Sequence, residues 1–238
     1  PEEQSLADEA TKLNREGEQL YQRGQPAAAV EKVRQALEIR KNLYPAAKYP
    51  DGHPQLATGL NNLGFVLQAM GQAEKASTFF QQSLDMNRTL FPASKYPDGH
   101  PELATGLNNL GTAFRAMGQA ENASTFFQQS LDMKLKLYPA AKYPDGHPQL
   151  ATGLNNLGTV LLAMGQAEKA ATFYRQSLDM RRQLYPAAKY PEGHPQLADS
   201  LNNLGGVLQA MNQAEKAANF FQQSLDMRRQ LYPAAKYP

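Results

Sequence analysis

One five-residue motif, Leu-Asn-Asn-Leu-Gly, constrains the fold most because the chain contains it four times at a fixed spacing. The copies begin at Leu60, Leu107, Leu154 and Leu201. A Lys-Tyr-Pro tripeptide recurs with the same period of 47 residues, first at Lys48 and last at Lys236. Such a period is typical of arrays in which each repeat stacks on its neighbours. We therefore divide the chain into five repeats of a single domain, residues 1–47, 48–94, 95–141, 142–188 and 189–235.

The composition of the chain disfavours several classes of function. The 238 residues carry a formal net charge of +2, which is too small an excess to favour binding to a nucleic-acid backbone. The chain has no cysteine, and therefore no disulfide, thiolate metal site or cysteine nucleophile. No apolar run approaches the ~20 residues of a membrane helix, and no signal peptide is recognisable. We expect a cytoplasmic protein that binds neither nucleic acid nor membrane.

Each repeat is predicted to fold as a pair of antiparallel helices, and residues 48–94 show the pattern most clearly. Apolar residues spaced by three or four positions give a first helix one stripe between Pro54 and Gly71. A second helix is expected from about Gln72 to Leu90. The turn between the helices needs a residue that tolerates the left-handed backbone conformation. Every repeat supplies glycine or asparagine there: Gly24, Gly71, Gly118, Gly165 and Asn212.

Small residues recur where the two helices of a repeat must approach closely. A glycine in the middle of a helix costs about 1 kcal/mol relative to alanine, so its recurrence at one position indicates a steric demand. These glycines are Gly17, Gly64, Gly111, Gly158 and Gly205. We interpret four serines of the second helices as small spacers that alanine would replace equally well, as Ala36 does in the first repeat: Ser83, Ser130, Ser177 and Ser224.

The segments that join consecutive hairpins have a composition of their own. Residues 92–101 contain Pro, Gly and Asp, which exclude a long helix. Because Lys, Tyr and Pro occupy fixed places in every copy, we predict an ordered loop. Tyr96 and Tyr143 are expected to pack over helix ends.

Taken together, these positions resemble the tetratricopeptide repeat. The residues that carry the resemblance in the second repeat are Leu60, Gly64, Leu67, Gly71, Ala76, Phe80, Ser83 and Leu84. The longer period and the His53-Pro54 pair are most similar to the kinesin-light-chain type and to bacterial arrays with long linkers. The resemblance implies an all-α, right-handed superhelical solenoid of five antiparallel helix-turn-helix hairpins. It also implies that the first helix of each hairpin lines a concave groove.

The two ends of the array differ in sequence. The first repeat has Arg15, Glu16 and Gln19 on what would be a stacking face, as expected of a terminal repeat that meets water. The last repeat keeps the interior pattern at Phe221 and Leu225. We expect the chain to be a fragment of a longer protein, with an open C-terminal face through which it associates end to end.

No residues form a recognisable catalytic or metal-binding constellation. The four histidines, His53, His100, His147 and His194, occur once per repeat, so stacking keeps them from converging on one ion. We interpret them as helix N-caps followed by proline. Basic residues gather at the ends of the second helices, where the helix dipole favours them: Arg40, Lys41, Lys134, Lys136, Arg181, Arg182, Arg228 and Arg229. The sequence therefore predicts no enzyme, metal or cofactor.

A ligand groove is expected along one face of the first helices. In the second repeat, Thr58, Asn61, Phe65 and Gln68 share that face and Asn62 borders it. Asparagine amides can satisfy the backbone of an extended peptide, or can instead bond to a neighbouring helix and fix repeat packing. Both roles remain open. The candidate groove residues are Asn61, Asn62, Phe65, Gln68, Asn108, Asn109, Thr112, Arg115, Asn155, Asn156, Thr159, Leu162, Asn202 and Asn203.

Near-identical repeats differ at two positions of this face. Phe65 corresponds to Glu18, Thr112, Thr159 and Gly206, and Gln68 corresponds to Tyr21, Arg115, Leu162 and Gln209. We expect Phe65 and Leu162 to make apolar contacts with a ligand and Arg115 to bind an acidic group; drift at unconstrained surface positions is the alternative. The sequence thus predicts a non-catalytic scaffold for an extended peptide or partner protein. A regulatory array of a larger enzyme, such as a CHAT-type protease, and a self-assembling rod are the alternatives.

Overall fold

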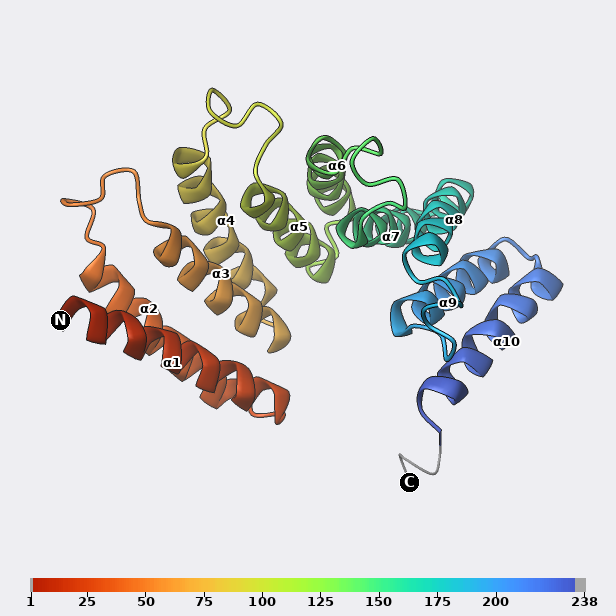
Figure 1. Cartoon of the computed structure of the whole chain (residues 1–238), viewed down its shortest axis with the longest axis horizontal. Helices are drawn as coiled ribbons and strands as arrows, with labels where there is room; N and C mark the ends of the chain where they lie inside the picture. The colour runs from red at the N-terminus through yellow and green to blue at the C-terminus, as the bar shows by residue number, and fades with distance from the viewer. Residues whose placement is uncertain (1, 234–238) are drawn as a thin grey trace. The chain divides into compact units, whose positions relative to one another are not determined.

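The computed structural model describes residues 2–233, and over that range the chain forms ten α-helices and no strand (Figure 1). They are α1 (Glu2–Gln22), α2 (Pro26–Leu43), α3 (Pro54–Ala69), α4 (Ala73–Leu90), α5 (Pro101–Ala116), α6 (Ala120–Leu137), α7 (Pro148–Ala163), α8 (Ala167–Leu184), α9 (Pro195–Ala210) and α10 (Ala214–Leu231). These helices make five consecutive hairpins and confirm the predicted all-α fold. The last Lys-Tyr-Pro copy, which begins at Lys236, lies outside the described residues.

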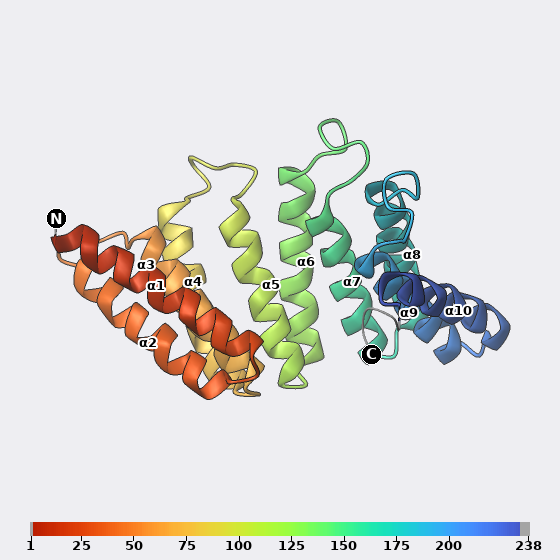
Figure 2. The same cartoon turned by 60° about the horizontal axis from the view of Figure 1, so that its bottom comes forward.

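The chain divides into two compact blocks, residues 1–126 and 127–238, and each is described by itself. In the first block, the long linkers α2–α3 and α4–α5 leave the hairpins at the end opposite the short turns (Figure 2). None of the helices in the described range is long and apolar enough to cross a membrane.

The histidines start the first helix of four hairpins. His53 has extended backbone angles, and its Nδ1 accepts a hydrogen bond of 3.2 Å from the backbone N–H of Gln55. Pro54 follows at the first helical position, where its missing N–H costs nothing. The same cap recurs at His100, His147 and His194 with distances of 3.3 Å. The predicted N-cap role is therefore confirmed.

Each hairpin turns through a residue with positive φ. Gly71 has a φ of 72°, and Asn212, which takes its place in the last repeat, has a φ of 58°. The N–H of Gly71 bonds to the carbonyl of Gln68, and the next N–H bonds to the carbonyl of Leu67, which closes α3. The predicted left-handed turn is confirmed at both residues.

The helices of a hairpin touch where the mid-helix glycine lies. A Cβ added to Gly64 would lie 2.7 Å from the ring of Phe80, a buried residue of α4. A Cβ at Gly205 would lie 2.8 Å from the ring of Phe221 in α10. An aromatic side chain approaches so closely that only glycine fits at these two positions, although glycine weakens a helix.

The interpretation of the serines as spacers is wrong. Ser83 in α4 donates a hydrogen bond of 2.8 Å from Oγ to the backbone carbonyl of Ala57 in α3, and both residues are buried. The corresponding bonds join Ser177 to Ala151 and Ser224 to Ala198. Because the helices approach so closely, a serine hydroxyl reaches across to the facing carbonyl, which alanine cannot do. Ala36 leaves the first hairpin without this bond.

Aromatic rings order the linkers between hairpins. Phe91, at the end of α4, stacks on His100 with ring centroids 3.6 Å apart, and Tyr96 meets both rings edge-on. The ammonium of Lys95 lies 5.8 Å from the centre of the Tyr96 ring. The other three described linkers repeat this cluster, with Tyr44, Tyr138 and Tyr185 in place of Phe91. The predicted packing of Tyr96 and Tyr143 near helix ends is confirmed.

Candidate functional site

The first block contains a cleft between α1 and α3. Its volume is about 430 Å³. The residues that line it are Thr11, Asn14, Arg15, Glu18, Tyr21, Val33, Asn62, Phe65 and Val66. We call it the α1/α3 cleft. Asn62 and Phe65 are predicted groove residues, and Glu18 and Tyr21 are the first-repeat counterparts of Phe65 and Gln68.

Two aromatic side chains stand open in the α1/α3 cleft. Phe65 is 54% exposed, while its neighbours Leu63 and Gly64 are buried. Tyr21 meets Phe65 edge-on, with ring centroids 5.6 Å apart. An edge-to-face pair is a favourable arrangement of two rings. The cleft therefore offers an apolar contact surface that the hairpin packing leaves uncovered.

The α1 side of the cleft carries both signs of charge. Arg15 and Glu18 lie one turn apart on α1, and within residues 2–233 neither makes an ion pair or a side-chain hydrogen bond. On the neighbouring surface, by contrast, Lys12 and Lys32 both pair with Glu16. The unpaired guanidinium and carboxylate are thus available to a ligand that carries complementary groups.

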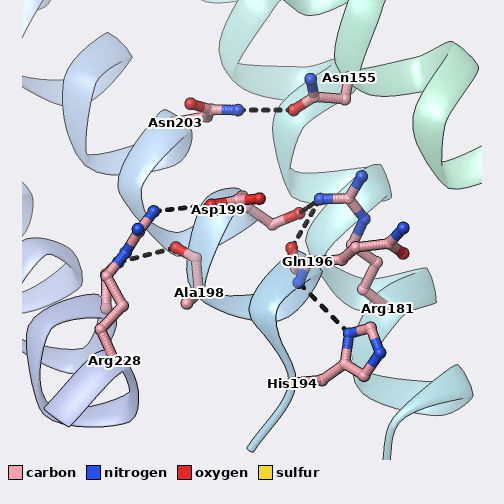
Figure 3. A network of polar contacts seen from close by, with 10 residues as sticks. Asn155, Arg181, His194, Gln196, Ala198, Asp199, Asn203 and Arg228 are labelled. Carbon is pink, nitrogen blue, oxygen red and sulfur yellow. Dashed lines mark hydrogen bonds and ion pairs between the residues drawn. The ribbon is translucent and has the colours of Figure 1, made fainter. Parts of the chain in front are cut away.

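The asparagines form hydrogen bonds between successive first helices. Asn109 Nδ2 in α5 donates to Asn61 Oδ1 in α3 at 2.7 Å. In the second block, Asn203 Nδ2 in α9 donates to Asn155 Oδ1 in α7 at 2.8 Å (Figure 3). In both pairs, the second asparagine of one repeat bonds to the first asparagine of the preceding repeat. These four residues therefore fix repeat packing, one of the two roles left open by the sequence.

The remaining predicted groove residues lie in varied surroundings. Thr112 and Thr159 donate to backbone carbonyls of their own helices at 3.0 Å, and Thr159 also accepts a bond from the Tyr174 hydroxyl. Arg115 and Asn202 are exposed, and the others are half-buried: Gln68, Asn108, Asn156 and Leu162. The structure places Gln68 and Arg115 in the first block and Leu162 and Asn202 in the second.

The first residue of three of the four basic pairs is buried, which the sequence interpretation missed. Arg40, Lys134 and Arg181 are each no more than 6% exposed. Arg181 Nη1 donates to the backbone carbonyl of Gln196 in α9 at 2.6 Å (Figure 3). It also donates to the hydroxyl of Ser200 in α9 at 2.8 Å. The helix dipole does not require such burial. The spacing along the helix could have revealed this burial. Arg181 follows the buried residues Tyr174 and Leu178 by seven and three positions, which places it on the same helix face.

Burial lowers the pKa of the cations at the repeat position of Lys134 and Arg181. It lowers the pKa of Lys134 to about 8, because the charged amine has left water without a carboxylate to stabilise it. Burial also lowers the pKa of Arg181, which Asp199 partly offsets. In residues 2–233, no group of three or more His, Asp or Glu side chains is placed to hold a metal ion. Arg40, Lys134 and Arg181 each lie against the first helix of the next repeat, so these buried cations belong to the contacts between repeats.

Consecutive hairpins with left-handed turns and aromatic linkers define a helical-repeat protein. The chain belongs to the tetratricopeptide repeat family. One model of that repeat matches residues 8–89, 140–183 and 187–230, and a second model matches residues 103–149. A search of curated proteins found no match.

Several solved structures are similar in fold. Nearly identical repeats of a putative kinesin light chain from Podosopora anserina have a TM-score of 0.71 and 20% identity, covering 94% of this chain and 96% of that one. BtubC from P. vanneervenii has a TM-score of 0.65 and 19% identity, covering 97% and 92%. A Rap protein complexed with competence and sporulation factor has a TM-score of 0.68 and 12% identity, covering 93% and 54%. The predicted likeness to kinesin-light-chain repeats is thus confirmed for the fold.

Proposed function

We propose that the chain is a non-catalytic cytoplasmic scaffold that binds an extended peptide of a partner protein along the first helices of its repeats. The observation that carries the proposal is the open aromatic pair of the α1/α3 cleft. Soluble proteins rarely leave large apolar side chains open in a cleft unless a partner covers them. Aromatic residues of this kind supply much of the binding energy in protein interfaces.

The lining of the cleft defines the peptide segment that would fit. An apolar side chain packs against Phe65 and Tyr21, while the Asn62 amide bonds to the peptide backbone. Arg15 and Glu18 favour an acidic and a basic group on either side of that anchor. We place the other predicted contacts at Gln68, Asn108, Thr112 and Arg115 in the first block. In the second block, we place them at Asn156, Thr159, Leu162 and Asn202.

Two structural neighbours support a peptide as the class of ligand. One is the Rap protein complexed with competence and sporulation factor, and another is a Rap conjugation regulator in complex with the Phr* peptide, which has a TM-score of 0.63. Both are below 25% identical to this chain, so they support the fold and a kind of ligand for that fold.

A displayed library of random 12-residue peptides provides the probe. Peptides selected on the chain are measured by isothermal titration, first with the unaltered protein and then with Phe65→Ala. Loss of a central aromatic contact should weaken binding by about tenfold or more. Tyr21→Ala should weaken it as well, because the two rings form one surface.

Leu135→Ala is the matched control, since Leu135 is also a large apolar side chain that is 52% exposed, but lies on α6 outside the cleft. It should leave the affinity unchanged. The proposal is wrong if the library yields no binder. It is equally wrong if Phe65→Ala and Leu135→Ala bind the selected peptides as tightly as the unaltered chain.

A further inference from the structure

The outer face of α10 exposes a leucine that every earlier repeat buries. Leu225 is 44% exposed. The leucines at the same repeat position are no more than 2% exposed: Leu37, Leu84, Leu131 and Leu178. The difference therefore lies in what covers the position, since the residue type is the same in all five repeats.

A helix with one recurring pattern covers the position in the earlier repeats. In the first block, Leu84 packs beneath α5 at Gly106, where an added Cβ would lie 3.2 Å from Leu84 Cδ1. In the second block, Leu131 packs at Gly153 of α7 with the same distance of 3.2 Å. A leucine precedes each glycine by three residues and another leucine follows it directly. The covering helix thus presents a Leu-x-x-Gly-Leu pattern, in which α9 has Ser200 in place of glycine.

An arginine beside the leucine marks the same surface. In the covered case, Arg181 of α8 bonds to the Gln196 carbonyl and the Ser200 hydroxyl of α9. Arg228 holds the corresponding place in α10, and there it pairs with Asp199 of its own hairpin at 2.6 Å (Figure 3). Leu225 and Arg228 therefore form the same surface as Leu178 and Arg181, but no helix of the described chain covers it.

We propose that the outer face of α10, centred on Leu225 and Arg228, is a docking surface for the first helix of another repeat of this type. The helix carries a Leu-x-x-Gly-Leu or Leu-x-x-Ser-Leu pattern. Its small residue lies on Leu225, and its backbone carbonyl accepts from Arg228 as Gln196 does from Arg181. This surface lies outside the α1/α3 cleft, so the inference does not depend on the proposed function.

The α1 helix of a second copy does not fit this description. At the positions of Leu103, Gly106 and Leu107, α1 has Glu9, Lys12 and Leu13. Lys12 would place a long charged side chain where the pattern needs a small residue, and would bring its ammonium near Arg228. The covering helix is therefore one of the type of α3, α5, α7 and α9, and head-to-tail pairing of two copies is disfavoured.

A peptide of residues 193–211, which contains the α9 pattern, is the probe. The chain is labelled with ¹³C at leucine methyl groups and titrated with the peptide, because nuclear magnetic resonance detects weak binding. We expect the Leu225 methyl signals to shift and saturate. A peptide of residues 2–22 should cause no such shift. Leu225→Glu should weaken binding of the α9 peptide by about tenfold or more, since a charge would replace the apolar contact.

Gln223→Glu is the matched control, because it adds the same charge to α10 at a position exposed in α4, α8 and α10 alike. It should bind the α9 peptide like the unaltered chain. The inference is overturned if the α9 peptide does not bind, or if Leu225→Glu binds it normally. It is also overturned if sedimentation shows that the chain alone associates through Leu225, since the occupant would then be a second copy.

Discussion

Asn109 donates a hydrogen bond of 2.7 Å to Asn61, which lies one repeat earlier in the chain. Asn203 and Asn155 are related in the same way. The bond joins the first helices of neighbouring hairpins on the face where a ligand was expected. The asparagine pairs therefore contribute to the packing between repeats, and Asn62 is the member that lines the α1/α3 cleft.

Removing one partner of this bond should destabilise the array. Asn109→Ala leaves the Asn61 carbonyl without its donor, so we expect the free energy of unfolding to fall by about 1 kcal/mol. Urea unfolding followed by circular dichroism measures the change. Asn202→Ala is the control, because Asn202 is exposed. Equal midpoints for both variants would contradict a packing role for Asn109.

The serine bonds within the hairpins predict a similar cost. Ser177→Ala removes the hydrogen bond to the Ala151 carbonyl at a buried position and should lower the free energy of unfolding by about 1 kcal/mol. Ser77→Ala is the control, because its hydroxyl bonds only to Glu74 of its own helix. That variant should stay within about 0.5 kcal/mol of the unaltered chain. If Ser177→Ala did so too, the bond to the Ala151 carbonyl would not stabilise the hairpin.

The histidine caps predict that stability falls in mild acid. Burial lowers the pKa of His53, His147 and His194 from the ordinary value of 6.5, and nearby Lys134 and Arg181 lower it further for the latter two. The folded chain therefore binds fewer protons than the unfolded chain. Its free energy of unfolding declines as the pH falls from about 6.5 towards the lowered values. Protonation of Nδ1 also removes the acceptor that caps the helix.

Melting temperatures between pH 7.5 and 5.5 test this dependence. A variant with all four histidines replaced by asparagine keeps a capping acceptor that does not titrate. It should lose less stability over that range than the unaltered chain. The same decrease in both proteins would show that other groups cause the acid sensitivity.

Removing the charge of Lys134 should raise the free energy of unfolding. Its folded pKa of about 8 lies below the ordinary value of 10.5, so stability is lost as the pH falls from about 10.5 to 8 and stays low at neutral pH. Lys134→Met should therefore raise the free energy of unfolding at pH 7 by about 1–3 kcal/mol. Lys136→Met, at an exposed position of the same helix, should have little effect. A loss of stability in Lys134→Met would mean that its ammonium is well satisfied.

The features that could be predicted from the sequence are those that depend on spacing along one chain segment. The hairpin turns at Gly71 and Asn212 and the His53 cap follow from local backbone chemistry, which the residue types reveal directly. The cleft positions Phe65 and Tyr21 emerged because near-identical repeats differ there. The Asn109–Asn61 bond and the bonds of Arg181 to Gln196 and Ser200 depend on how one repeat lies against the next, and side-chain partners across helices are not encoded in spacing alone.

Site-specific cross-linking tests most directly whether a peptide binds over Phe65 in the α1/α3 cleft. A benzophenone amino acid in place of Phe65 keeps an aromatic ring there and couples to bound peptide under ultraviolet light. We expect cross-linking of the library-selected peptide from position 65 and none when the same group replaces Leu135. Cross-linking from position 135, or none from position 65 while the peptide still binds, would contradict it.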